Sequence, residues 1–346
     1  MAHTYTRAVF VAPRQIRFDE VPIPEPGPHQ ALVRVHACAL CTWEQRLYSG
    51  EERHYPLLGG HEVAGELVKL GSQVYMDIQP GDRVMASTLT RCFHCEACRR
   101  GLNNICDNQR KLMNAGDVPG PGGLAEYVLL DDYQVYKASN DAPYEEICLS
   151  EPLACVVRSL KQSRVQRGDD AVVIGAGVMG LLHVTLLKQI GARVIVSEID
   201  PARIEFARKM GVHAVINPKE RPFVDQIREL TNGRGADVIY CAVSIASVVE
   251  EAVESVAKGG RVHLYASIYP RDARITINPN LFHSKEIVLT GTVSQDQEDV
   301  RQAVRIISQG QINLKPFISL VLPFERLDEG MQAAMRSDTY RVIVTM

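Results

Sequence analysis

Residues 171–180 read AVVIGAGVMG, a short apolar run followed by the spacing G-x-G-x-x-G. The apolar run predicts a buried strand, and the apolar pattern after it predicts a helix ended by a glycine. A strand, a glycine-rich turn and a helix in this order are typical of a dinucleotide-binding loop. Gly175 permits the tight turn, Gly177 lets a pyrophosphate approach the backbone, and Gly180 lets the helix pack closely on the strand.

The first turn of the predicted helix, Val178-Met179-Gly180, offers backbone N–H groups to the coenzyme phosphates. The next predicted strand ends at Glu198, 18 residues after Gly180. A carboxylate at this place accepts hydrogen bonds from both hydroxyls of the adenosine ribose and repels a 2′-phosphate. The sequence therefore favours NAD over NADP, and the nearby Arg203 weakens that preference.

Buried strands and amphipathic helices alternate beyond this loop. Residues 247–260 predict a helix and residues 261–266 a strand, while Asp200 is predicted to cap a helix that starts at Pro201. Strands separated by helices indicate a parallel, doubly wound sheet of the Rossmann type. We therefore place an NAD-binding domain at residues 151–292.

The chain before this domain has a different pattern. Residues 1–150 contain many short apolar runs between Gly and Pro turn signals, which predicts a β-barrel or Greek-key domain of short strands. Residues from about 293 to 346 contain one helical pattern and short segments, and we expect them to rejoin the first domain. A chain of 346 residues is too long for one ordinary core, which also indicates two domains.

Four of the nine cysteines fall within residues 92–106, with the spacing C-x2-C-x2-C-x7-C. Zn²⁺ favours four thiolates in a tetrahedron, and a short loop with this spacing can surround one ion. Since four protein ligands leave no coordination position for a substrate, we interpret these residues as a structural zinc site: Cys92, Cys95, Cys98 and Cys106. A zinc ribbon that binds nucleic acid and an iron–sulfur cluster are the alternatives.

The composition narrows the class of protein. Hydrophobic residues make up 46% and charged residues 23%, and the formal net charge of −3 gives no basic excess for nucleic acid or anionic membranes. The first residues contain no apolar stretch of signal-peptide length, and no run approaches the roughly 18 apolar residues of a spanning helix. We expect a cytoplasmic protein without nucleic-acid or membrane partners, in which clustered thiols bind metal.

Three further stretches are weak signals when taken singly: ALCTWEQRLYSG (39–50), LGGHEVAGE (58–66) and LSEPLACVV (149–157). Together with the cysteine spacing, GAGVMG and GGLAEYVLL, they follow the order found in the zinc-dependent medium-chain dehydrogenases. The chain resembles that family over essentially its whole length, in particular the sorbitol (polyol) dehydrogenase branch. The resemblance implies an α/β protein with a GroES-like β-barrel catalytic domain beside the Rossmann domain.

The resemblance also implies a second, catalytic zinc, so that each chain would bind two zinc ions and NAD. Cys41 and His61 would bind this ion. Glu62 and Glu151 would be its acidic groups, one bound directly and the other directly or through water, and the sequence leaves open which is which. Glu44 would brace the ligand histidine.

Some positions depart from the family pattern. Trp43 replaces the Ser or Thr that begins proton transfer in many members, and Arg46 replaces a histidine found in some. The proton route is therefore open, and a zinc-bound water with Glu151 is the candidate. Sorbitol-type members carry an Arg-Tyr pair that grips the polyol, and this chain has Ser294 and Gln295 there. The resemblance therefore does not extend to sorbitol itself. Arg46 could pair with an acidic or phosphorylated substrate, although a solvated surface arginine is the commoner explanation.

The function that the resemblance implies is a zinc- and NAD(P)-dependent alcohol or polyol dehydrogenase. Such an oxidoreductase would interconvert a secondary alcohol of a polyol, sugar or cyclitol with its ketone by hydride transfer. The alternatives are a dehydrogenase of a phosphorylated or amino-acid-type alcohol, as in threonine dehydrogenases, and a relative that binds without catalysis. Family resemblance also suggests a homodimer or homotetramer.

Overall fold

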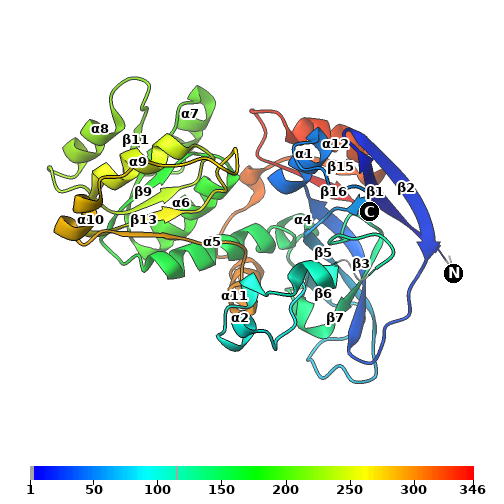
Figure 1. Ribbon diagram of the computed structural model, residues 1–346. Coiled ribbons are helices and arrows are strands. Elements are labelled where there is room, and N and C mark those ends of the chain that lie inside the picture. Colours follow the sequence, from blue (N-terminus) through cyan, green and yellow to red (C-terminus); the bar gives the residue numbers. More distant parts are fainter. Residues whose placement is uncertain (1–3, 114–115) are drawn as a thin grey trace. The chain divides into compact units, whose positions relative to one another are not determined.

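The computed structural model describes residues 4–113 and 116–346 (Figure 1). The chain divides into two compact units, of which the second spans Cys155–Ser294. The first unit ends at Ala154 and resumes at Gln295–Met346. The sequence predicts these boundaries after residue 150 and at about residue 293, a few residues earlier in each case. Helix α5 (Ser150–Ser163) crosses the first boundary, so the chain enters the second unit within a helix.

The second unit is built on a sheet in which all pairings are parallel. Its strand order is β11-β10-β9-β12-β13-β14, which becomes 3-2-1-4-5-6 when the strands are numbered within the unit. This is the order of a doubly wound dinucleotide-binding fold. The strands are β9 (Asp170–Ile174), β10 (Arg193–Ser197), β11 (Ala214–Ile216), β12 (Ala236–Cys241), β13 (Val256–Leu264) and β14 (Val288–Gly291).

Two of the helices between these strands show the caps that the sequence predicts. Helix α6 ends before Gly191, whose φ of 89° is left-handed, and Asp200 accepts hydrogen bonds from the backbone N–H groups of Ala202 and Arg203 at 2.9 and 3.0 Å. The cap predicted at Asp200 is thereby confirmed. The helices are α6 (Val178–Ile190), α7 (Pro201–Lys209), α8 (Phe223–Leu230), α9 (Ala246–Ser255) and α10 (Pro279–Lys285).

The prediction of a helix over 247–260 was wrong in its second half. Helix α9 ends at Ser255, and strand β13 starts directly at Val256, so that residues 256–260 of the predicted helix belong to the strand. The strand opens with an irregular pairing in which Ala236 lies opposite Val256 and Val238 opposite Arg261. A bulge of this kind adds residues to one strand, and it hides the period-two pattern that identifies a strand in the sequence.

The first unit contains an antiparallel sheet of order β2-β1-β4 and a larger sheet of order β15-β16-β3-β5-β6-β8, in which β7 also pairs with β3. Short strands of this kind were predicted for residues 1–150. The strands are β1 (Thr4–Ala12), β2 (Gln15–Pro22), β3 (Gln30–Ala39), β4 (Leu57–Leu58), β5 (Glu62–Leu70), β6 (Arg83–Ser87), β7 (Tyr127–Asp131), β8 (Val135–Lys137), β15 (Ile318–Pro323) and β16 (Arg341–Thr345).

The helices of the first unit are short, with the exception of α11. One core packs the sheets against α1 and α12, through residues such as Leu47 and Leu327. The helices are α1 (Thr42–Ser49), α2 (Glu96–Arg99), α3 (Gln109–Met113), α4 (Tyr144–Ile147), α11 (Gln297–Ser308) and α12 (Leu327–Ala334), with 3-10 turns at Asn103–Ile105, Asp132–Gln134, Lys315–Phe317 and Phe324–Arg326.

Strand register sets the place of the candidate catalytic residues. β3 and β5 are antiparallel neighbours, and Ala39 lies opposite Glu62. The end of β3 therefore lies beside the start of β5. Cys41 follows β3 by two residues and His61 immediately precedes β5, so that the register alone brings these two side chains close together.

Candidate metal centres and dinucleotide loop

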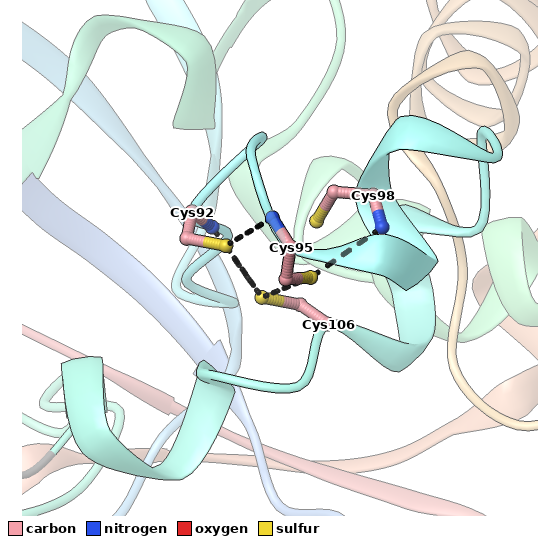
Figure 2. A group of neighbouring side chains, drawn as sticks. All are labelled: Cys92, Cys95, Cys98 and Cys106. Atoms are coloured by element: carbon pink, nitrogen blue, oxygen red, sulfur yellow. Dashed lines mark hydrogen bonds between the residues drawn. The ribbon is translucent and has the colours of Figure 1, made fainter.

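The four clustered cysteines converge on one point in the loop around α2 (Figure 2). Their Sγ atoms all lie within 4.8 Å of one another, and none of the four forms a disulfide. The Sγ atom of Cys106 is 3.5 Å from that of Cys92 and 3.9 Å from that of Cys95. A zinc–sulfur bond of about 2.3 Å gives a tetrahedron with edges of roughly 3.8 Å, so this arrangement fits a zinc ion.

Hydrogen-bond donors surround the same sulfur atoms. The backbone N–H groups of Cys92, Cys95 and Cys98 donate to sulfur atoms of the cluster at 3.3–3.5 Å. The side-chain amide of Asn108 donates to the Cys92 sulfur at 3.3 Å and makes the largest contribution among several hydrogen bonds that together lower the pKa of that thiol to about 5. Donors of this kind stabilise thiolates, which are the form of cysteine that binds metal.

A second group of candidate ligands lies at the start of β5. One ligand atom each from Cys41, His61 and Glu62 lies within 4.8 Å of the others. Sulfur, imidazole and carboxylate ligands together are typical of zinc. The sequence-based candidates Cys41, His61 and Glu62 are therefore brought together, and the chemistry of their donor atoms fits this metal.

Glu44 holds two of these ligands in place. The buried Glu44 carboxylate accepts hydrogen bonds from His61 Nδ1 at 2.8 Å, from the Gly60 backbone N–H at 2.9 Å and from the Cys41 backbone N–H at 3.2 Å. Burial raises the pKa of Glu44, but the charge of His61 and these hydrogen bonds outweigh it and lower the pKa overall. With Nδ1 bonded to Glu44, Nε2 is the ring nitrogen left for a metal.

Glu62 makes a buried ion pair that the sequence did not predict. Arg341, at the start of β16, donates to both carboxylate oxygens of Glu62, with Nε 2.9 Å from Oε2 and Nη2 in contact with Oε1. The Glu62 side chain is fully buried and the Arg341 side chain is 5% exposed. Two positions 279 residues apart in the chain thus share one charged pair beside the candidate ligands.

The electrostatic setting of this group favours a cation. Burial alone would lower the pKa of His61, but Glu44 and Cys41 together raise it well above its ordinary value. Burial likewise opposes the charge of Arg341, yet Glu62, Cys41 and Glu151 raise the pKa of its guanidinium. The negatively charged groups around His61 and Arg341 stabilise the protonated forms of both side chains, and the same negative charge attracts a metal ion.

Glu151 lies outside the group of converging ligand atoms. It sits in the first turn of α5, is 7% exposed, and raises the pKa of Glu62 through its charge. Burial is the larger cause of that rise. The structure thus places the carboxylate of Glu62 with Cys41 and His61, and it places Glu151 close enough to act on Glu62 through charge.

Trp43 and Arg46 occupy the helix that follows Cys41. The Trp43 ring meets the His61 ring edge-on, with centroids 5.8 Å apart, and Trp43 also packs against the core of the first unit. Arg46, one turn further along α1, lies 3.7 Å from Glu51, and its side chain is 19% exposed. Trp43 therefore forms a wall beside the candidate ligand His61.

The dinucleotide loop has the local geometry that its glycines predict. Gly175 has a φ of +100° and donates its N–H to the Ser197 carbonyl at 2.8 Å. A Cβ at Gly180 would overlap the carbonyl oxygen of Gly175, so α6 can approach β9 only with glycine there. Gly177 caps α6, whose first turn contains Val178 and Met179.

Glu198 follows β10 and turns back toward the glycine loop. Its buried carboxylate accepts hydrogen bonds from the backbone N–H groups of Ala176 at 2.7 Å, Ile199 at 2.6 Å and Asp200 at 3.0 Å. A Cβ at Gly177 would lie 3.7 Å from Arg203 Nη1, so the guanidinium is next to the phosphate-binding turn. The structure thus gathers the predicted coenzyme residues at one end of the parallel sheet.

Two family models match this chain. Residues 27–140 match the alcohol dehydrogenase GroES-like domain, and residues 178–309 match the zinc-binding dehydrogenase domain. The predicted pairing of a GroES-like domain with a Rossmann sheet is thereby confirmed, and the class defined by fold and sequence is that of a two-domain dehydrogenase.

Individual relatives extend this agreement over almost the whole chain. The L-threonine 3-dehydrogenase of Pyrococcus horikoshii is 32% identical over 94% of this chain and 93% of its own length, and the sorbitol dehydrogenase of Bacillus subtilis is 27% identical over 97% and 96%. A Sinorhizobium meliloti structure, described as a zinc-binding dehydrogenase bound to NADP, covers both chains fully with 27% identity and a TM-score of 0.91. The chain belongs to the zinc-dependent medium-chain dehydrogenase family.

Sequence reasoning missed part of the site. Arg341 and Asn108 contact candidate ligands, and Gly123 packs against the residue before His61, but none of the three belongs to a motif that predicts this. The segment GGLAEYVLL, which includes Gly123, served only as a mark of the family.

Within the described residues, no helix is both long enough and apolar enough to cross a bilayer.

Proposed function

We propose that this protein is a zinc- and NAD-dependent oxidoreductase that interconverts a secondary alcohol of a polyol, sugar or cyclitol with its ketone by hydride transfer. The observation that carries the proposal is the convergence of Cys41, His61 and Glu62 on one point in a chain that also has a dinucleotide loop. The Cys92–Cys106 cluster would hold a structural zinc, because four thiolates complete its coordination.

The residues of the catalytic group have distinct roles in this proposal. Zinc bound by Cys41 and His61 would supply Lewis acidity, which makes an alcohol easier to deprotonate at neutral pH. Glu44 fixes the imidazole of His61, and Trp43 shields one side of it from water. Glu62 and Glu151 add the negative charge that holds a cation, and Arg341 balances part of it.

A substrate panel tests the proposal. The zinc-loaded protein and NAD should form NADH, followed by absorbance, with at least one secondary alcohol among polyols and cyclitols. The panel also contains sugar phosphates and hydroxy amino acids, which test the alternative raised by the threonine dehydrogenase relatives and by Arg46. A protein with two zinc ions per chain that oxidises none of the panel would contradict the proposal, and one that binds only a single zinc would be a non-catalytic relative.

Glu198→Ala should weaken the preference for NAD. In the proposed complex the carboxylate binds the ribose hydroxyls, and each hydrogen bond to a charged group contributes about 1.5–3 kcal/mol, so the KM for NAD should rise roughly 10- to 100-fold. Removing the negative charge should also lower the KM for NADP. Steady-state kinetics with both coenzymes measure the ratio.

Two further variants separate the ribose contact from loop stability. Glu198→Gln keeps an oxygen that can accept from the Ala176 backbone N–H and removes the charge, so it should gain NADP activity with a smaller loss of NAD affinity. Glu205→Gln removes an exposed carboxylate from α7 and should leave both KM values unchanged. An unchanged NAD/NADP ratio in Glu198→Ala would show that this residue does not select the coenzyme.

The proposal extends to the oligomeric state and the cellular compartment of the protein. We expect a cytoplasmic homodimer or homotetramer, as the family resemblance implies, whose partners are a small alcohol or ketone and the coenzyme. The net charge of −3 supports the absence of nucleic-acid and membrane partners.

A further inference from the structure

Two backbone segments of the first unit run side by side immediately before His61. The Leu58 N–H donates to the Pro119 carbonyl at 2.8 Å, the Gly123 N–H to the Gly60 carbonyl at 2.9 Å, and the Leu124 N–H to the Gly59 carbonyl at 3.1 Å. We call residues 58–60 and 119–124 the glycine seam. Its hydrogen bonds tie a segment from far along the chain to the residues that lead into a candidate metal ligand.

The seam is closed so tightly that its centre excludes side chains on both segments. A Cβ at Gly123 would lie 2.6 Å from the Gly60 carbonyl oxygen and would overlap Val63 Cγ2. Gly60 has a φ of +89°, and a Cβ there would lie 2.5 Å from the Gly123 carbonyl carbon. The φ of Gly123 is outside the left-handed region, so only this contact, and not backbone conformation, requires glycine at 123.

The seam connects directly to the candidate ligands. The Gly60 N–H donates to the same Glu44 oxygen that accepts from His61 Nδ1, and the other Glu44 oxygen accepts from the Cys41 N–H. A shift of Gly60 would therefore move the start of His61 and also disturb the carboxylate that orients its ring. The separation of the two segments sets the position of the imidazole relative to Cys41.

The far side of the seam is fixed to the barrel. The Leu124 carbonyl accepts from the Ala8 N–H at 2.9 Å, and Arg7 donates to both carboxylate oxygens of Asp117 at 3.0 and 2.6 Å. Both contacts attach the 117–124 segment to β1. Because the segment is fixed to β1, strain from a Cβ at Gly123 falls on the opposite side of the contact, on Val63 of β5 and on Gly60.

We propose that Gly123 is a positioning residue for the Cys41–His61–Glu62 metal site, acting through the glycine seam. The inference rests on the proposed function only in assuming that this group binds zinc. Partners of metal ligands that set their orientation typically change metal affinity 10- to 100-fold when altered. Gly123→Ala should therefore lower the zinc affinity of this site by about that factor and leave the four-cysteine site unchanged.

The first test compares zinc binding in Gly123→Ala, in the parent protein and in Gly116→Ala by competition with a chromophoric chelator. Gly116 is exposed and lies just before Asp117, and among the described residues only the Val118 carbonyl oxygen, at 3.6 Å, lies near an added Cβ. We expect two tightly held ions in the parent and in Gly116→Ala, and one tight and one weakened ion in Gly123→Ala. Co²⁺ substitution should show an altered ligand-field spectrum in Gly123→Ala alone.

The proposal would be overturned if each site of Gly123→Ala bound zinc as tightly as the same site of the parent. It would also be overturned if both sites of the variant were weakened by the same factor. A parent protein that binds only one ion would instead contradict the proposed function. If Gly123→Ala does not fold, backbone hydrogen exchange is measured instead on the parent protein, once with one zinc ion bound and once with two. The seam N–H groups of Leu58, Gly123 and Leu124 should exchange about tenfold more slowly with two ions, because coupling between sites is reciprocal. Unchanged exchange at all three would overturn the proposal.

Discussion

His61→Ala should remove one of two zinc ions per chain and lower alcohol oxidation by about 1,000-fold or more. The imidazole is one of three converging candidate ligands, and it is the one whose side chain Glu44 orients by a hydrogen bond. A Lewis-acid metal contributes several kcal/mol of transition-state stabilisation, and each 1.4 kcal/mol corresponds to about a tenfold change in rate. Metal content by elemental analysis and NADH formation by absorbance measure the two effects on the same sample.

The four-cysteine site is the internal control for this variant. Cys92, Cys95, Cys98 and Cys106 should keep their ion in His61→Ala, which shows that the loss of zinc is confined to the other site. His54→Ala removes an exposed histidine from the segment before β4 and should change neither zinc content nor rate. Two ions per chain in His61→Ala, with full activity, would exclude this residue from the metal site.

Arg341→Met should lower the free energy of unfolding of the first unit by about 3–5 kcal/mol. The variant leaves the fully buried Glu62 carboxylate without its cationic partner, and breaking a buried pair from one side costs this much even where the intact pair contributes little net stability. Trp43 is the only tryptophan and lies in the first unit, so its fluorescence during denaturant unfolding reports on this unit. Measuring the free energy of unfolding with one and with two zinc ions bound separates the effect of the lost ion pair from any effect of weakened metal binding.

A surface pair provides the matched control. Arg336 pairs with Asp338 at 2.5 Å, with side chains 65% and 60% exposed, and Arg336→Met should leave the free energy of unfolding nearly unchanged, because water screens an exposed pair. If both variants lower the unfolding midpoint equally, burial does not set the strength of the Glu62–Arg341 pair. A loss below about 1 kcal/mol for Arg341→Met would mean that water reaches Glu62 in the variant.

Motifs whose residues are close in sequence were predictable. The spacing of Cys92, Cys95, Cys98 and Cys106 predicts convergence because a short loop has few ways to place four sulfur atoms. The dinucleotide loop was likewise predictable, since a strand, a left-handed glycine and a helix start are each set by neighbouring residues. Alternation of strands and helices was sufficient to predict the parallel sheet, because right-handed crossovers leave few other arrangements.

The start of β13 shows where local reasoning fails. Residues 256–260 continue the helical pattern of α9, yet they form the start of β13, where Val256 pairs with Ala236 of β12. Tertiary pairing outweighed the local preference for a helix there. Strand propensity depends on contacts with neighbouring strands, and it is therefore more sensitive to tertiary context than helix propensity. The sequence left open whether Glu62 or Glu151 lies directly at the metal, and the structure places the Glu62 carboxylate with Cys41 and His61.

The sequence by itself determined the two-unit organisation, the cysteine cluster and the coenzyme loop, because each depends on residues within one or two elements. Only the tertiary structure decided that Arg341 pairs with Glu62 and that Gly123 packs against Gly60. Those contacts join segments that are distant in the chain, and their geometry depends on strand register and close packing, which no local pattern encodes.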